Sequence, residues 1–322
     1  MAERGSGMRA DIAEQPRAAR AAVDAAEQAL RHLPRPRGVI LFGRGTSEHA
    51  ALYGRYLLET RTALPALVGS PSVATLYGAR LDLDGWLAVG VSQSGETREI
   101  ADCLRWATTR RARTCAITND AESPLAREAD VAVTLNAGPE RAVAATKTFT
   151  AQCVALAVLA GGWADAATDW PRLVEAIDAA TQRQPPAEVV EALAEAELLV
   201  ALARGLHVPI ALELALKAME GCQVWATGAS WADLLHGPIA ALPGRATVLT
   251  LRAGELGGDP RERLRAAGHH VVDLAGERLP AGLEHLQPIV DLIAGQRAVL
   301  EAARRRGTDP DRPPGLTKVT QT

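Results

Sequence analysis

The stretch Trp86-Leu87-Ala88-Val89-Gly90-Val91-Ser92-Gln93-Ser94-Gly95-Glu96-Thr97 decides how this chain folds. Its first six residues form an apolar run of strand length, and the polar residues and glycine that follow predict a tight turn. Apolar residues then recur at helical spacing, so the turn leads into the N-terminus of a helix, where free N–H groups attract anions. We predict a phosphate site with Ser92, Gln93, Ser94 and Thr97 as donors. An ordinary strand-to-helix loop is the alternative.

The same order of strand, small-residue turn and helix occurs earlier in the chain. Residues 38–43 form an apolar run, followed by Arg44-Gly45-Thr46-Ser47 and a helix from about residue 48 to 59. Further strand-like runs lie at 64–68, 114–118 and 130–134, and helical patterns lie at 97–109 and 123–128. Strands that alternate with helices predict a parallel sheet covered on both faces. Hydroxyl-rich turns after two such strands lie where open α/β sheets bind ligands.

The second half of the chain repeats this pattern without the hydroxyl groups. The apolar run 198–205 matches 39–45, and 248–255 matches 89–96, at offsets of 160 and 159 residues. Two matches at nearly one offset predict a tandem duplication of one α/β unit. Leu206-His207 replaces Thr46-Ser47 in the second copy. Only the first copy is therefore predicted to hold a phosphate.

The fold class predicted from these patterns is α/β, with two tandem doubly wound parallel-sheet domains, each a three-layer α-β-α arrangement. The length of 322 residues is sufficient for two cores. The predicted segments are an N-terminal helical segment at 1–35, a first domain at 36–165, a second domain at 166–306, and a C-terminal tail at 307–322. A single leading helix is expected from Asp11 to Leu33, where Pro34 and Pro36 end it.

Composition excludes several classes of protein. Apolar residues make up 48% and aromatic residues 3%, which predicts an aliphatic core. The net charge of −3 and the lack of a basic run argue against nucleic acid. The polar N-terminus and the short apolar run at 153–163 predict no signal peptide and no membrane span. His269-His270 lacks ligand companions, so no metal is expected. We expect a soluble cytoplasmic protein whose four cysteines are reduced core residues, at positions Cys103, Cys115, Cys153 and Cys222.

Three further places carry candidate chemistry. Glu213, Lys217 and Glu220 lie at i, i+4 and i+7 on one helical face, a spacing that is also typical of a solvated row of ion pairs. His236 precedes Gly-Pro in a predicted loop, where a histidine is structural at least as often as catalytic. Lys318 lies near the C-terminus, where a lysine is usually solvated. Each of these signals is weak when taken alone.

The order of these segments resembles the sugar isomerase (SIS) family, and within it the isomerase half of glucosamine-6-phosphate synthase. The matching pieces cover almost the whole chain: GRGTS at 43–47, SQSGET at 92–97, NAGPERAVAATK at 136–147, ARG…PIALELALKAMEG at 203–221, HGP at 236–238 and GLTKVT at 315–320. The sequences RGTS and AGPERAVAATK resemble those of stand-alone double-SIS glucosamine-6-phosphate deaminases even more closely than those of the synthase.

The resemblance implies a homodimer that acts on an amino-sugar phosphate without a cofactor, and the reaction is a C1/C2 proton transfer. It implies that Glu220, beside Lys217, is the proton-transfer base. It further implies that His236 comes from the neighbouring subunit and opens the sugar ring, and that Lys318 closes over the substrate and can form a Schiff base. The residues implied to bind substrate or phosphate are Gly45, Thr46, Ser47, Ser92, Gln93, Ser94, Thr97, Val143 and Ala145.

The chain departs from the family pattern at three points. Ala145 replaces a family serine, and Asp233 replaces the usual glutamate before the HGP motif. The synthase also carries a glutaminase domain whose nucleophilic cysteine follows Met1, whereas here Ala2 follows Met1. We therefore expect ammonia, and not glutamine, as the nitrogen species.

Other functions remain open. A related SIS enzyme could eliminate water, or could isomerise an N-acetylhexosamine 6-phosphate or a fructosamine 6-phosphate. A non-catalytic sugar-phosphate sensor is the alternative from another class. A nucleotide-binding dehydrogenase is disfavoured, because the GxGxxG pattern begun at Gly43 reaches Glu48, whose carboxylate would meet a pyrophosphate.

Overall fold

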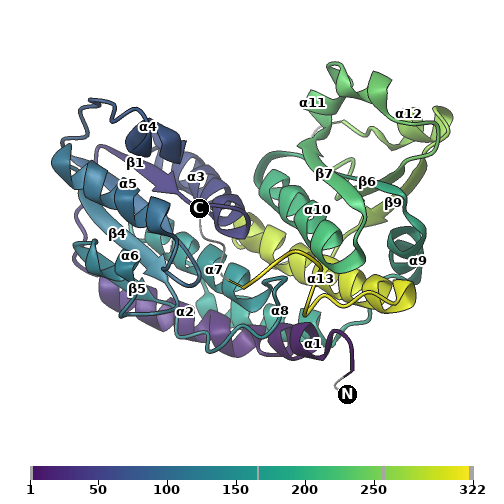
Figure 1. Cartoon of the computed structure of the whole chain (residues 1–322), viewed down its shortest axis with the longest axis horizontal. Coiled ribbons are helices and arrows are strands. Elements are labelled where there is room, and N and C mark those ends of the chain that lie inside the picture. Colours follow the sequence, from purple (N-terminus) through teal and green to yellow (C-terminus); the bar gives the residue numbers. More distant parts are fainter. Residues whose placement is uncertain (1–2, 165–166, 256–257, 319–322) are drawn as a thin grey trace. The chain divides into compact units, whose positions relative to one another are not determined.

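The computed structural model describes residues 3–164, 167–255 and 258–318. The chain divides into two compact units (Figure 1). The five-stranded unit comprises Gln15–Pro139, Lys147–Val174 and Thr317–Thr322, and the four-stranded unit comprises Met1–Glu14, Glu140–Thr146 and Glu175–Leu316. The division into functional domains at 1–35, 36–165, 166–306 and 307–322 remains a prediction.

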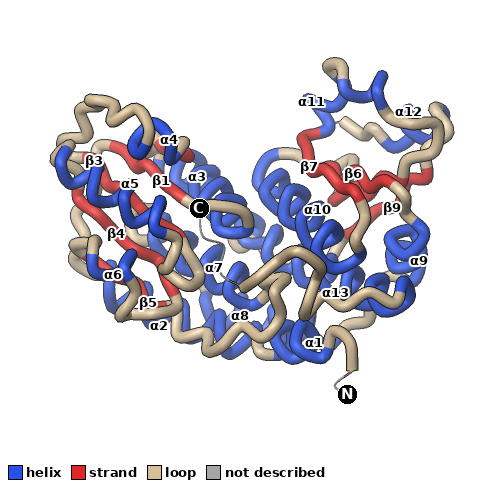
Figure 2. The backbone as a smooth tube through the Cα atoms, viewed as in Figure 1, coloured by secondary structure: helices blue, strands red, loops and turns tan. Residues whose placement is uncertain are grey.

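The five-stranded unit is built on a parallel sheet of order β2-β1-β3-β4-β5 (Figure 2). Its strands are β1 (Gly38–Phe42), β2 (Ala66–Val68), β3 (Trp86–Val91), β4 (Arg113–Thr118) and β5 (Val131–Thr134). Its helices are α2 (Gln15–Leu30), α3 (Thr46–Thr62), α4 (Pro71–Thr75), α5 (Arg98–Thr109), α6 (Pro124–Arg127) and α7 (Lys147–Gly161). The strands and helices predicted for this region are therefore confirmed.

The strand order explains why helices cover both faces of this sheet. From β1 the chain moves outward to β2, whereas from β3 it moves in the opposite direction to β4. Because parallel crossovers are right-handed, α3 and α5 lie on opposite faces. On the α5 face, Ile40 and Phe42 pack with Ile100 and Leu104 in a buried aliphatic cluster. Phe42 also meets Trp106 edge to face, with 6.4 Å between ring centroids.

The four-stranded unit is built on a second parallel sheet, of order β7-β6-β8-β9. Its strands are β6 (Leu198–Ala203), β7 (Trp225–Ser230), β8 (Thr247–Leu251) and β9 (His270–Leu274). Its helices are α1 (Ser6–Ala13), α9 (Ala187–Glu195), η1 (Gly205–His207), α10 (Val208–Cys222), α11 (Trp231–Leu235), η2 (Pro238–Ala241), α12 (Arg261–Ala266), η3 (Glu284–Leu286) and α13 (Gln287–Arg306). Helix α8 (Trp170–Gln182) spans the division between the units. The prediction of parallel α/β sheets is confirmed.

Helix α10 lies at the centre of the four-stranded unit, against β6, β7 and α13. Two glycines allow its close packing. A Cβ atom on Gly228 of β7 would lie 2.5 Å from the Leu212 backbone, and one on Gly295 of α13 would lie 2.4 Å from a Leu214 methyl group. Larger residues at either position would push α10 away from its neighbours.

The two sheets share a strand order. The order β7-β6-β8-β9 corresponds one to one with β2-β1-β3-β4, and the pairs β1/β6 and β3/β8 are those matched in the sequence. This correspondence is a topological fact about the two sheets.

The N-terminal helix differs from its prediction. The single helix expected from Asp11 to Leu33 is two helices, α1 and α2, which are interrupted at Glu14. Pro16 causes the break, because it has no N–H to donate to Ile12 and its ring would clash with the Ile12 carbonyl. Apolar periodicity continues through the break, so the prediction of a single helix was wrong.

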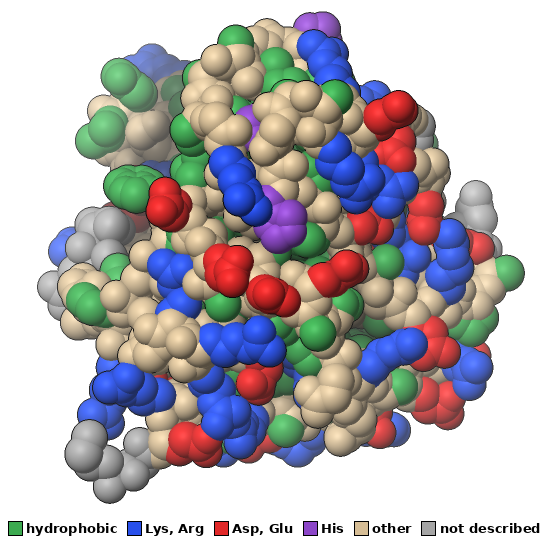
Figure 3. Space-filling view, turned by 90° about the vertical axis from the view of Figure 1, so that its right-hand side faces the viewer, with side chains coloured by type: hydrophobic (Ala, Val, Ile, Leu, Met, Phe, Trp, Pro, Cys, Tyr) green, Lys and Arg blue, Asp and Glu red, His purple; other side chains and the backbone are tan. Residues whose placement is uncertain are grey.

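All four cysteines are buried and free, as predicted. Burial raises the pKa of Cys103, Cys115 and Cys222 to about 12, so their thiols stay protonated. Among the described residues, no helix is both long and apolar enough to cross a bilayer. Charges of both signs are interspersed over the face seen in Figure 3.

Candidate active site

Two hydroxyl-bearing turns lie side by side at one edge of the five-stranded sheet. They follow β1 and β3, which are adjacent parallel strands paired with Phe42 opposite Gly90. The strand order reverses between these two strands, and open α/β sheets bind ligands at such a point. The structure thus brings together the first-copy residues predicted to hold phosphate, namely Gly45, Thr46, Ser47, Ser92, Gln93, Ser94 and Thr97.

The turn after β3 is held open by its own hydrogen bonds. The Ser92 hydroxyl accepts the Gly95 N–H at 3.2 Å and lies 3.3 Å from the Thr97 hydroxyl. Thr97 precedes α5 without capping it by its side chain. Gly95 has φ +68°, and a Cβ there would lie 2.1 Å from the Ser123 hydroxyl. The sequence Ser-Gln-Ser-Gly therefore produces an open loop at a helix N-terminus, where an anion is stabilised.

The turn after β1 is positioned by two residues that the sequence patterns did not single out. Gln152 of α7 donates to the buried Ser47 hydroxyl at 3.0 Å. Arg44 forms a two-bond ion pair with Glu99 in the first turn of α5, at 2.8 and 3.0 Å. The hydrogen bond to Glu99 raises the pKa of Arg44. The Arg44–Glu99 pair links the two turns. It forms because β1 and β3 are adjacent strands, and the sequence patterns do not show this pairing.

The corresponding edge of the four-stranded sheet is filled by a buried ionic cluster. Asp291 of α13 is fully buried, 2.8 Å from His207 Nε2 and 2.6 Å from Arg252 Nε. Burial alone would raise the pKa of Asp291, but His207 and Arg252 outweigh it and the pKa is lowered. The cluster satisfies its own charges within the protein, whereas the first sheet offers hydroxyl groups.

Helix α10 carries three charged residues on one face, and most of this face is buried. The side chains of Lys217 and Glu213 are 0% exposed, and that of Glu220 is 15% exposed. Lys217 Nζ lies 3.4 Å from Glu213 and 2.5 Å from Glu220 Oε2. The interpretation as a solvated row of ion pairs is therefore wrong. The i, i+4, i+7 spacing could not have indicated this burial, because the same spacing occurs on exposed helices.

Burial and charge act on Lys217 in opposite directions. Desolvation alone would lower its pKa, but the carboxylates of Glu213 and Glu220 outweigh that effect and the pKa is raised. Lys217 is thus a buried cation at neutral pH, held between two carboxylates. Glu213 also belongs to the candidate site because it binds Lys217. In the sequence it appears only as one member of the i, i+4, i+7 series.

His236 lies at the C-terminal end of α11 and is exposed. Its backbone N–H donates to the Asp233 carbonyl at 3.1 Å. The next residue, Gly237, has φ +146°, which only glycine adopts without strain, and Pro238 then begins η2. The HGP sequence is therefore a sharp turn that presents the imidazole at the surface of the four-stranded unit.

The 140–146 loop, which contains Val143 and Ala145, is held by α1. Asp11 is 0% exposed and accepts the backbone N–H groups of Arg141 and Ala142 at 2.7 and 3.0 Å. Its other oxygen accepts from the Arg141 guanidinium at 2.8 Å. Such charge-assisted bonds are about twice as strong as neutral ones.

The start of α1 also holds the beginning of the C-terminal tail. Gly7 and Met8 each donate a backbone N–H to the Asp311 carboxylate at 2.8 Å, and Gly5 donates to Asp309 at 3.1 Å. Lys318, which follows this segment, is half-buried and belongs to the five-stranded unit. Val319 and Thr320 of the predicted tail motif lie outside the described residues.

Lys217→Met should destabilise the protein by about 3–5 kcal/mol, because it leaves Glu213 as an uncompensated buried charge. The folded-state pKa of Lys217 lies above 10.5, so its contribution is complete below pH 10.5 and is lost as the pH rises through the folded-state value. The gap between wild type and variant should therefore be constant from neutral pH to about pH 10 and shrink above it. Urea unfolding monitored by circular dichroism measures this gap.

The double variant Glu213→Gln/Lys217→Met is the matched control for Lys217→Met. It removes both buried charges, so it should recover part of the lost stability. A Lys217→Met variant as stable as wild type would contradict the assignment of a buried, paired ammonium.

Comparison with known proteins places the chain in a family. The model of the SIS domain matches residues 32–161, which is the region of the five-stranded sheet. The match covers one SIS domain and does not extend to the four-stranded sheet. The predicted resemblance to the SIS family is confirmed, whereas the expectation of two SIS domains is not covered by this match.

Relatives in sequence and structure agree with this placement. A protein of Silicibacter pomeroyi DSS-3, named as a candidate phosphosugar isomerase, is 35% identical, with a TM-score of 0.85 over 95% of this chain and 99% of that one. The C-terminal domain of glucosamine-fructose-6-phosphate aminotransferase from Francisella tularensis is 26% identical, with a TM-score of 0.77 over 94% and 97% of the two chains. Glutamine–fructose-6-phosphate aminotransferase from Halobacterium salinarum is 33% identical over 304 residues, 85% of this chain and 50% of that protein.

The chain spans about half the length of the curated relatives it matches. Its similarity to the Silicibacter pomeroyi protein, in contrast, extends over nearly the full length of both chains. The chain therefore belongs to the SIS family of phosphosugar isomerases.

Proposed function

We propose that the protein is an amino-sugar-phosphate isomerase or deaminase that acts on glucosamine 6-phosphate or a close hexosamine 6-phosphate. The observation that carries the proposal is the buried Lys217 between Glu213 and Glu220 on α10. A fully buried ammonium with two carboxylates costs desolvation energy that a purely structural helix would avoid by using apolar residues. Of the two carboxylates, Glu220 is the one that reaches the surface.

In the proposed mechanism, the sugar phosphate binds at the two turns of the five-stranded unit. The hydroxyls of Ser47, Ser92, Ser94 and Thr97, together with the N-terminus of α5, supply neutral donors and a positive dipole. The phosphate is remote from the reacting carbons, so its binding energy serves to orient them.

Proton transfer between C1 and C2 is assigned to Glu220. One carboxylate over both carbons can remove the proton from one and return it to the other. Lys217 binds Oε2 of Glu220, which fixes the carboxylate and leaves the second oxygen for the substrate. Glu213, on the far side of Lys217, keeps the ammonium in place.

His236 and Lys318 are assigned to the ring oxygen and to the carbonyl carbon. We propose a homodimer in which His236 serves the neighbouring subunit's site, and its exposure on the HGP turn supports this role. Lys318 would form an imine at C2 of the ketose, whose carbonyl oxygen leaves as water, and ammonia would then displace the lysine nitrogen. The chain has only three lysines, at 147, 217 and 318, among 35 basic residues. A lysine can lose its proton and act as a nucleophile, whereas an arginine cannot.

Ammonia is the proposed nitrogen species. Cysteine-dependent hydrolysis of glutamine would need a reactive thiolate, but all four cysteines are buried. Burial raises the pKa of three of them to about 12, which keeps those thiols protonated.

The four-stranded unit shares the strand order of four strands of the five-stranded unit. We propose that it is a second SIS domain, derived from the first by duplication, and the shared strand order supports this origin. It would have exchanged the phosphate turns for the Asp291 cluster while gaining the catalytic residues of α10.

The specific substrate follows from a direct assay. Glucosamine 6-phosphate, its N-acetyl form, the galactosamine analogue, and fructose 6-phosphate with ammonia or glutamine are each incubated with the purified protein. We expect interconversion of glucosamine 6-phosphate and fructose 6-phosphate with ammonia, followed by NMR and mass spectrometry. Turnover with glutamine but not ammonia would contradict the proposed nitrogen species. Elimination of water, or turnover of the N-acetyl form alone, would favour the lyase or N-acetylhexosamine alternatives that Ala145 and Asp233 leave open.

Glu220→Gln tests the base. The variant keeps shape and hydrogen bonding but removes basicity, so turnover should fall at least about 100-fold. Exchange of the C1 or C2 proton with deuterated solvent should fall equally, while the fold and the affinity for the sugar phosphate persist. Glu262→Gln, at an exposed glutamate of α12, is the control. Exchange at a near wild-type rate in Glu220→Gln would return Glu220 to a structural role. Binding without any exchange in the wild type would indicate a sensor.

A mixture of two inactive variants tests the donated histidine. If His236 crosses the dimer interface, unfolding and refolding His236→Ala with Glu220→Gln forms mixed dimers with one complete site. Because half of the dimers are mixed and one of their two sites is complete, activity should return to about a quarter of wild type. Equal inactivity of the mixture and the separate variants would place His236 in its own subunit's site.

A further inference from the structure

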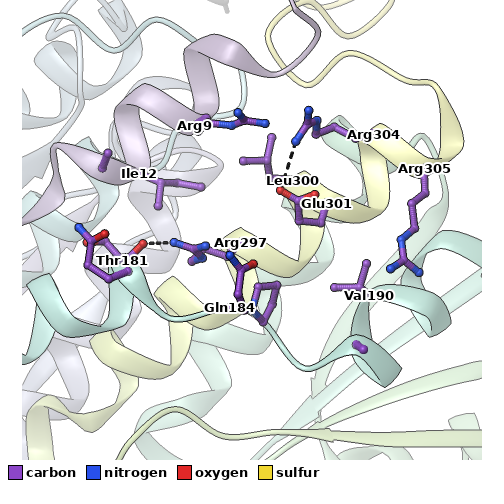
Figure 4. Close-up of a pocket in the computed structure, with 14 residues that line it drawn as sticks. Arg9, Ile12, Thr181, Gln184, Val190, Arg297, Leu300, Glu301, Arg304 and Arg305 are labelled. Atoms are coloured by element: carbon purple, nitrogen blue, oxygen red, sulfur yellow. Dashed lines mark hydrogen bonds and ion pairs between the residues drawn. The ribbon is translucent and has the colours of Figure 1, made fainter.

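A cavity of about 670 Å³ lies within the four-stranded unit, between α1, the end of α8, the segment after it, and α13. Its volume is in the range of small-molecule sites. Arginines and polar groups dominate its wall (Figure 4). None of the residues assigned above to the phosphosugar or to proton transfer lines it.

Positive charge exceeds negative charge around this cavity. Its lining has four arginines, Arg9, Arg297, Arg304 and Arg305, and one acidic residue, Glu301. Glu3 lies nearby and contributes a second negative charge. Four positive charges less two negative ones leave a surplus of two.

Two of the arginines already converge on one anionic atom. Arg9 of α1 and Arg304 of α13 point toward one another (Figure 4), and both contact the same carboxylate oxygen, Oε1 of Glu3. The Glu3 side chain is 55% exposed, so it is held only at its end. Glu3 thus occupies the position that an oxygen of an anionic ligand would take, and a ligand can displace it at little cost.

Arg297 provides a second binding position deeper in the wall. One of its terminal nitrogens donates to the Thr181 carbonyl, but its Nε is buried and has no hydrogen-bond partner among the described residues. Burial lowers the pKa of Arg297, Glu301 opposes this, and the positive charge of Arg9 adds to the lowering. A buried cation with an unpaired N–H is costly, and the negative charge of an anion in the cavity would offset part of that cost.

We propose that this cavity binds a small organic phosphate, whose phosphate group replaces the Glu3 carboxylate between Arg9 and Arg304 and extends toward Arg297. Displacing Glu3 raises the surplus to three positive charges, of which a carboxylate ligand would neutralise one and a phosphate dianion two, and guanidinium groups bind phosphate in a bidentate manner. Ile12, Val190 and Leu300 supply apolar wall for the organic part, and Gln182 and Gln184 supply hydrogen-bonding groups.

Calorimetric titration of the full-length protein with inorganic pyrophosphate tests the proposal. Wild type should show two classes of site, one at the hydroxyl turns and one in the arginine cavity. Arg9→Gln/Arg304→Gln should weaken the cavity site at least about tenfold, because charge-assisted hydrogen bonds are lost. Glu3→Gln should strengthen it by about threefold, because the competing internal carboxylate is gone. Ser94→Ala/Thr97→Ala should weaken only the other class of site.

The controls separate this inference from the proposed function. Arg245→Gln removes an exposed arginine of the same unit away from the cavity and should bind pyrophosphate like wild type. Equal binding by wild type, Arg245→Gln and Arg9→Gln/Arg304→Gln would overturn the cavity site and leave the phosphosugar proposal intact. If the double arginine variant does not fold, Glu3→Gln decides, since unchanged or weaker binding by that variant overturns the inference.

Discussion

Two aspartates of the four-stranded unit join segments that are far apart in the sequence, and the loop at 140–146 depends on them. Asp11 accepts two backbone N–H groups of this loop, and Asp311 accepts two at the start of α1. Asp11 has no water to replace these bonds, because it is fully buried. Helix α1 therefore fixes both the loop with Val143 and Ala145 and the beginning of the C-terminal tail.

Each unit uses the carboxyl end of its sheet differently, although the strand order is the same. In the five-stranded unit, small hydroxyl residues leave the helix N-termini accessible to an anion. In the four-stranded unit, the Arg252 guanidinium and the His207 imidazole bind Asp291 at this edge, so an internal carboxylate already occupies these groups. The candidate catalytic residues of this unit lie instead on α10, where Lys217 pairs with two carboxylates of the same helix.

In the arginine cavity, as in the Asp291 cluster, arginine side chains pair with a carboxylate of the protein. In the Asp291 cluster the carboxylate is 0% exposed, whereas Glu3 at the cavity is 55% exposed. A fully buried carboxylate is a permanent partner, because its removal leaves unpaired cations in a medium of low dielectric constant. An exposed carboxylate is exchangeable for a ligand. The difference in burial therefore separates a structural ion cluster from a candidate binding site.

The sequence by itself determined the parallel sheets, the hydroxyl turns and the family, because strand and helix periodicity and turn chemistry are local properties of the chain. The sequence also placed Glu220 beside Lys217, since residues three apart on a helix share a face. Only the tertiary structure decided that this face is buried and that Gln152 holds Ser47. The break between α1 and α2, the Asp11 and Asp311 bonds, and the convergence of Arg9 and Arg304 on Glu3 likewise required the structure. Burial and pairing between distant segments depend on packing, and local patterns in the sequence do not encode which distant segments meet.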